Sequence, residues 1–219
     1  VSAPSAPMRA SAAFMFKHPA HAIALGFGSG LSPKAPGTVG SLWGWASWLL
    51  IQHSLSLPMQ AALIGCAILL GWWACTVTAQ HMQIADSGHI VWDEIAAFWL
   101  VLWLLMPAGW LMQLVAFALF RMFDALKPEP MAWADRHFKG FGPRGGFGIM
   151  LDDLLAAFCT LLVLAHALHP KEAALVTEAL ADAARRQPRL LVSADSARHL
   201  GRADVVVFDG VFAYTRYFE

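Results

Sequence analysis

Apolar and polar positions alternate in long blocks along this chain. Uncharged stretches rich in aliphatic and aromatic side chains occupy 41–51, 59–79, 95–120 and 154–165. Pro107 and Gly109 interrupt the third stretch, and such breakers favour a tight turn between two helices. The pattern therefore predicts five apolar helices.

Length and composition place these helices in or on a membrane. Only the stretch over 59–79 reaches the roughly 20 residues that a helix needs to span hydrocarbon, so some of the others are expected to enter the bilayer without crossing it. Hydrophobic residues make up 58% of the chain and charged residues 14%, against about 25% charged in soluble domains. We expect an all-α fold, a compact bundle of about five apolar helices in or on the membrane, with a small appended C-terminal segment.

The charges are distributed unevenly between the connections. The turns at 52–58 and 107–109 carry no charged residue, whereas the N-terminal leader and the segments 80–94 and 121–153 carry every charge before position 170. If the helices alternate up and down, all charged segments fall on one face. That face holds the Lys and Arg residues, so the positive-inside rule predicts that it is cytoplasmic.

The two ends of the chain differ from the apolar middle. Residues 1–19 are expected to be a flexible leader, because they lack the long apolar core of a secretory signal. Residues 20–169 form the expected membrane-embedded domain, and 170–219 a C-terminal extension of unknown role. In that extension, 171–186 is typical of an amphipathic helix and 202–214 of a short strand followed by a turn.

Charge and cysteine content exclude several function classes. The chain has 15 basic and 15 acidic residues, so it has no electrostatic footprint for nucleic acid. Cys66, Cys75 and Cys159 all lie inside apolar stretches without metal-ligand spacing. They indicate small buried side chains rather than a disulfide framework.

Three charged clusters stand at the ends of apolar helices. IVWDEIAAFWL places Asp93 and Glu94 at the start of one helix, and GGFGIMLDDLLAAF places two acids at the start of the last one, after a glycine-rich loop. In FRMFDALKPEP the three-residue spacing puts three charges on one side of a helix that ends before Pro128. With one more acid in the connection WADRHFKG, the candidate residues are Asp93, Glu94, Arg121, Asp124, Lys127, Asp135, Asp152 and Asp153.

Each cluster alone has a structural interpretation, because acids in a first helical turn complement the macrodipole. Together they predict a site. Carboxylates that converge repel one another and need a cation to neutralise them. Oxygen ligands without cysteine or a histidine pair favour Mg²⁺, and nearby Arg and Lys can hold phosphate oxygens. Phosphoryl chemistry is the natural fit.

The glycine-rich stretch GFGSGLSPKAPGTVGS, residues 26–41, is a candidate wall of that site. Glycines let backbone N–H groups approach an anion, and a loop entering a helix offers amides and hydroxyls to phosphate. The alternative is a flexible lead-in to an apolar helix. The candidate substrate-binding residues here are Gly28, Ser29, Gly37, Thr38 and Ser41.

In order and spacing, GFGSGLSPKAPGTVGSL, IVWDEIAAFWL, FRMFDALKPEP and GGFGIMLDDLLAA resemble the phosphatidylglycerophosphatase A family over about residues 20–168. The resemblance implies an all-helical, Mg²⁺-dependent enzyme of the bacterial inner membrane. Such an enzyme hydrolyses the phosphomonoester of phosphatidylglycerophosphate to phosphatidylglycerol and phosphate. By motif position, the resemblance also implies that the eight candidates correspond to the family's charged site residues. Ala97 and Ala157 stand at positions where glycine is common in the family. The loop KGFGPRGGFGIM is longer than the family's shorter form and adds Arg144 as a candidate contact to the lipid headgroup.

The expected mechanism divides these residues by role. Asp93, Glu94, Asp152 and Asp153 would hold one or two Mg²⁺ ions, while an arginine and a lysine, Arg121 and Lys127, would grip the phosphate oxygens. Two routes stay open for the remaining acids. Asp124 or Asp135 would act as general base, or one of them as a nucleophile through an aspartyl-phosphate.

Two other kinds of membrane protein carry a few charged residues among apolar helices. A CDP-alcohol phosphatidyltransferase would carry a D-G-x-x-A-R run, which this sequence lacks. Another membrane lipid-phosphate enzyme remains an alternative, as does a small membrane transporter or assembly subunit. Transport favours polar residues near helix midpoints, whereas here they cluster at helix ends.

Overall fold

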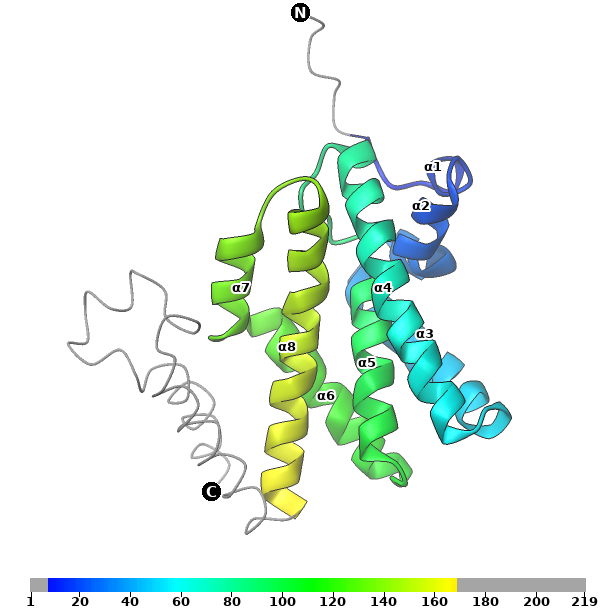
Figure 1. Ribbon diagram of the computed structural model, residues 1–219, viewed down its shortest axis with the longest axis vertical. Coiled ribbons are helices and arrows are strands. Elements are labelled where there is room, and N and C mark those ends of the chain that lie inside the picture. The colour runs from blue at the N-terminus through cyan, green and yellow to red at the C-terminus, as the bar shows by residue number, and fades with distance from the viewer. Residues whose placement is uncertain (1–7, 169–219) are drawn as a thin grey trace, which may run out of the picture.

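The computed structural model describes residues 8–168, and every element in that part of the chain is a helix (Figure 1). The all-α prediction is confirmed there, and the five apolar helices correspond to α3, α4, α5, α6 and α8. The C-terminal extension 170–219 and residues 1–7 of the leader lie outside the described residues. The elements are α1 (Ala12–Met15), α2 (Pro19–Ala24), the 3₁₀ helix η1 (Gly26–Leu31), α3 (Pro36–Ser54), α4 (Leu57–Met82), α5 (Trp92–Leu105), α6 (Trp110–Leu126), α7 (Met131–Phe138) and α8 (Pro143–Leu168).

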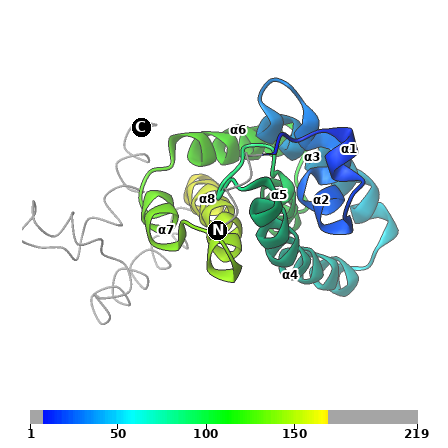
Figure 2. The same cartoon turned by 90° about the horizontal axis from the view of Figure 1, so that it is seen from above.

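Helix α5 forms the centre of the bundle. Its sequence is apolar on all sides after the first turn, and a helix of that kind is stable only when neighbours surround it. Residues 92–99 are all buried, and α5 packs against α3, α4, α6 and α8 (Figure 2). Phe98 packs against Phe120, with ring centroids 5.4 Å apart. Two acids in the first turn of α5 are thereby carried into the protein interior.

The uncharged turns and the charged connections lie at opposite ends of the bundle. In Figure 1 the α3–α4 and α5–α6 turns are at the lower end, while the α4–α5 and α7–α8 connections are at the upper end. This arrangement is the one that alternating helices predict.

Two helices in the described part of the chain are long and apolar enough to cross a membrane, α4 and α8. Large apolar side chains on α3, α4 and α6 are exposed, and so extensive an apolar surface is typical of contact with lipid or a partner. They include Trp43, Leu50, Leu69, Trp72, Trp73, Trp110, Leu111 and Leu114.

The start of α8 differs from the prediction. The glycine-rich run that we expected to be a loop is helical, because α8 begins at Pro143. Asp152 and Asp153 therefore lie in the interior of the helix, and the prediction that they stand at its start after a glycine-rich loop is wrong. Close packing explains the glycines, since a β-carbon at Gly146 would lie 1.9 Å from Thr76 Oγ1 on α4.

We expect Gly146→Ala to lower the free energy of unfolding by about 2 kcal/mol, because overpacking forces neighbouring elements apart. The added carbon would also meet backbone, 2.9 Å from Thr76 Cα. Denaturant unfolding in detergent measures the change. Gly65→Ala is the control in the interior of α4, where a β-carbon meets nothing within 4 Å; it should be neutral or slightly stabilising. Equal stability of the two variants would contradict the packing explanation.

Part of the expected flexible leader is folded. Phe14 and Met15 on α1 are buried, and the Met8 amide donates to Met82 O at the end of α4, with N and O 3.0 Å apart. His21 on α2 stacks on Phe14 with ring centroids 4.0 Å apart. The described residues of the leader therefore pack against the bundle, because their apolar side chains complete a small second core.

Candidate active site

A cavity of about 310 Å³ opens where α5, α6, α7 and α8 meet the segment between α4 and α5. Six candidate acids line it, so the predicted convergence of these carboxylates is observed. Lys127 lines it as well. The acids are Asp93, Glu94, Asp124, Asp135, Asp152 and Asp153.

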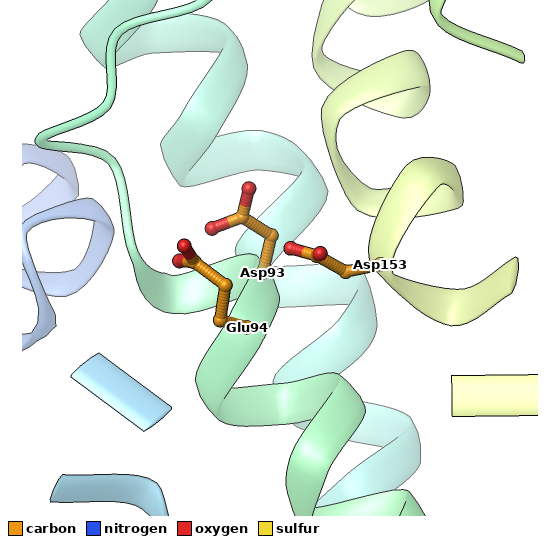
Figure 3. A group of neighbouring side chains, drawn as sticks. All are labelled: Asp93, Glu94 and Asp153. Atoms are coloured by element: carbon orange, nitrogen blue, oxygen red, sulfur yellow. The ribbon is translucent and has the colours of Figure 1, made fainter. Parts of the chain in front are cut away.

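Three of these acids form a buried carboxylate trio, Asp93, Glu94 and Asp153. Each offers one oxygen, and these oxygens lie within 4.8 Å of one another. Figure 3 shows Asp153 extending from α8 toward Asp93 and Glu94, which come from the first turn of α5. Sequence-distant helices thus supply one compact group of ligand atoms.

Burial sets the electrostatics of the trio. Desolvation raises the pKa of Asp93 well above its usual range, and the neighbouring Glu94 carboxylate raises it further. Desolvation and the Asp124 charge raise the pKa of Glu94 to about 7, although Arg121 acts in the opposite direction. A cation placed among these oxygens would reverse this effect, because it favours the charged form of each carboxylate.

The trio suits a hard divalent cation. Asp93 Oδ1, Glu94 Oε2 and Asp153 Oδ1 are buried and have no hydrogen-bond partner among the described residues. Unsatisfied buried carboxylate oxygens are costly, and oxygen ligands of this kind match Mg²⁺. Asp152, expected as a fourth ligand, is not a member of the group.

Asp152 instead pairs with Lys127, whose Nζ donates to Asp152 Oδ2. Lys127 ends α6 in a left-handed conformation with φ 43°. Burial lowers the pKa of Lys127, but the hydrogen bond and charge of Asp152 outweigh it and hold that pKa above its usual value. A permanently charged ammonium group therefore faces the cavity.

Arg121 lies between α3 and the trio. Its Nη1 is 2.8 Å from Asp124 Oδ2 and 3.5 Å from Glu94 Oε1, and it donates to Ser41 Oγ at 3.3 Å. The predicted shared side for Arg121 and Asp124 is observed, because they pair at three-residue spacing. Arg121 is not among the cavity-lining residues, so it holds carboxylates in place.

The glycine-rich stretch reaches the site only at its helical end. A β-carbon at Gly37 would lie 2.2 Å from Glu94 Oε1 and 3.1 Å from Arg121 Nη2, so Gly37 makes room for this ion pair. Ser41 Oγ donates to Gly37 O at 3.0 Å. Gly28, Ser29 and Thr38 do not line the described cavity.

Arg144 is also away from the cavity lining. Its guanidinium donates to His137 O at 2.8 Å and lies 5.6 Å from the centroid of the Phe138 ring. It holds the connection between α7 and α8.

Sequence reasoning missed three polar residues that line the cavity, Asp86, Ser87 and Lys139. Asp86 belongs to the charged segment before α5. Its position in the sequence shortly before Asp93 is the signal that could have identified it as a site residue. Lys139 follows Asp135 by four residues and stands directly after the end of α7, and their side chains pair at 3.6 Å. That spacing places the two charges on one helix face.

The family model and two relatives of the same name identify one family. The family model described as Phosphatidylglycerophosphatase A matches residues 22–168 of this chain. A protein of that name from Haemophilus influenzae (strain ATCC 51907 / DSM 11121 / KW20 / Rd) is 40% identical over 146 residues, which cover 67% of this chain and 86% of the relative. One from Escherichia coli (strain K12) is 40% identical over 139 residues, covering 64% and 77%. A further relative, from Bacteroides thetaiotaomicron, is named Putative phosphatidylinositol-3-phosphatase and is 36% identical over 150 residues, which cover 65% of this chain and 89% of that relative. No solved structure matches the chain.

Proposed function

Because this chain belongs to the phosphatidylglycerophosphatase A family, we propose that it is a phosphatase acting on phosphatidylglycerophosphate in phospholipid biosynthesis. Water cleaves the terminal phosphomonoester, giving phosphatidylglycerol and inorganic phosphate. The observation that carries the proposal is the carboxylate trio at the cavity, together with Lys127 in its wall.

The proposed cofactor is Mg²⁺, held by Asp93, Glu94 and Asp153. Their three unpartnered oxygens support this assignment. When bound, Mg²⁺ supplies the positive charge that a phosphomonoester dianion needs before a nucleophile can approach it. Asp152 has a different proposed role, since its carboxylate holds the Lys127 ammonium group.

The other charged residues divide into binding and positioning groups. Lys127 lines the cavity and donates to a phosphate oxygen. Arg121 positions Glu94 and Asp124 through its ion pairs. Asp124 and Asp135 line the cavity and are the carboxylates available as general base or nucleophile. Rapid quenching during turnover separates the routes, since only the nucleophile route leaves a phosphorylated aspartate.

The proposed location is the bacterial inner membrane, with several helices in the bilayer and the cavity facing the cytoplasm. The two apolar helices α4 and α8 support membrane association. The charged connections lie at the end of the bundle opposite to the uncharged turns (Figure 1), and the Lys and Arg residues there favour the cytoplasmic side.

Phosphate release from phosphatidylglycerophosphate in detergent micelles tests the function. We expect purified protein to release phosphate with Mg²⁺ and to lose this activity with a chelator, regaining it when Mg²⁺ is restored. Phosphatidic acid, a lipid phosphomonoester without the second phosphate, should be the poorer substrate. Absence of release from phosphatidylglycerophosphate with Mg²⁺ would refute the proposed function, and full activity in chelator would refute the proposed cofactor.

A further inference from the structure

The cavity has an unusual balance of charge. The described lining contains seven carboxylates, the six candidates and Asp86, but only two lysines, Lys127 and Lys139. A substrate with two phosphates brings further negative charge, so each cation in the lining matters. Lys127 is held by Asp152, which leaves Lys139 as the cation without an assigned role.

Lys139 is the more exposed of the two lysines that line the described cavity. Its side chain is 61% exposed, while its partner Asp135 is 30% exposed and lies 3.6 Å away. An ion pair this exposed contributes little and exchanges partners at low cost. The Lys139 ammonium group is therefore available to a ligand and is more exposed than that of Lys127, whose side chain is 36% exposed and also bonded to Asp152.

The backbone around Lys139 is fixed although its side chain is largely exposed. The residue follows the end of α7 directly. Arg144 on α8 donates to the carbonyl of His137, two residues before Lys139, with an N–O distance of 2.8 Å. Phe138 packs on Phe147 of α8, with ring centroids 5.2 Å apart. These contacts hold the Lys139 backbone at the cavity, and such support is what a binding residue needs.

The chemistry of the proposed substrate matches this layout. Its phosphomonoester must reach the buried trio, while its acyl chains remain in lipid. The phosphodiester lies between these two parts, one glycerol away from the monoester, and therefore outside the trio, where Lys139 is the more exposed cation of the described lining. We propose that Lys139 binds the phosphodiester of the lipid substrate and is a specificity-determining residue. This inference rests on the proposed function.

The test compares ligands that carry one or both phosphates. Phosphatidylglycerol has the diester alone, glycerol 3-phosphate has the monoester alone, and phosphatidylglycerophosphate has both. For Lys139→Gln we expect KM for short-chain phosphatidylglycerophosphate and the inhibition constant of phosphatidylglycerol to rise about fivefold, the size typical of one partly exposed charge pair. The inhibition constant of glycerol 3-phosphate should stay within about twofold of the original.

The control is Lys17→Gln, which removes an exposed lysine outside the cavity lining and should change none of the three constants. Unchanged binding of phosphatidylglycerol to Lys139→Gln would overturn the inference. An equal rise in the inhibition constant of glycerol 3-phosphate would also overturn the inference. Such a rise would show that Lys139 acts through Asp135 or through the overall electrostatic field of the cavity. Failure of the unaltered protein to hydrolyse phosphatidylglycerophosphate would instead refute the proposed function, so the two failures are distinguishable.

Discussion

Asp153→Asn should abolish phosphate release and at the same time make the metal-free protein more resistant to heat. The activity is expected to fall about a thousandfold or more, because the amide removes a charged ligand from the trio and weakens the field on the substrate phosphate. Phosphate release with saturating Mg²⁺ measures this part of the prediction.

The stability change has the opposite sign. Without a cation, the trio brings together buried carboxylates whose free oxygens have no hydrogen-bond partner in the described structure. Removing one of these charges relieves repulsion and desolvation, so Tm at pH 8 in chelator should rise by about 3 °C or more. Mg²⁺ should raise Tm of the unaltered protein by binding the folded state, and should leave that of Asp153→Asn unchanged.

Asp86→Asn is the matched control for Asp153→Asn. Asp86 also lines the cavity, but it is exposed and is not a member of the trio. Its replacement should leave the Mg²⁺-dependent rise in Tm intact and change the activity by only a few-fold. A variant Asp153→Asn that keeps both full activity and the Mg²⁺ response would disprove the role of the trio.

Gly37→Ala should lower kcat by about a hundredfold while the protein still folds, because misplaced catalytic groups are costly even when the fold is kept. The new methyl group would meet Glu94 Oε1 at 2.2 Å and Arg121 Nη2 at 3.1 Å. Both side chains must then move, and Glu94 leaves its place in the trio. Steady-state phosphate release and circular dichroism measure the two parts of the prediction.

Gly65→Ala again serves as the control, because a β-carbon there meets nothing within 4 Å. It should retain full activity. Thr38→Ala separates two explanations of the glycine-rich stretch: direct phosphate contact would make this variant defective, whereas a packing role for Gly37 leaves it active. Wild-type kcat in Gly37→Ala would contradict the packing role.

The fold class and the position of the two site acids on α5 can be predicted from the sequence. Ser87 and Gly88 break the apolar pattern before Asp93, so the start of α5 and the position of its two acids can be predicted from helix signals. The convergence of acids follows from charge being confined to one set of connections. These features are local, and the structure agrees with them.

Other parts depend on tertiary packing. Successive residues of a helix point about 100° apart, so only the orientation of α8 decides that Asp153, and not Asp152, joins the trio. The glycines before Asp152 indicate a loop by propensity, yet close contact of Gly146 with α4 keeps them helical. Spacing likewise does not distinguish Lys139, which lines the cavity, from Arg144, which holds the α7–α8 connection.

The central claim is that Asp93, Glu94 and Asp153 bind the divalent cation of this phosphatase. A titration with Mn²⁺, which shares the oxygen-ligand preference of Mg²⁺, tests it directly when bound ion is followed by electron paramagnetic resonance. The purified protein should bind Mn²⁺, Asp152→Asn should retain that binding, and Asp153→Asn should lose it. Binding by Asp153→Asn equal to that of the unaltered protein, or no binding by the unaltered protein, would contradict the account.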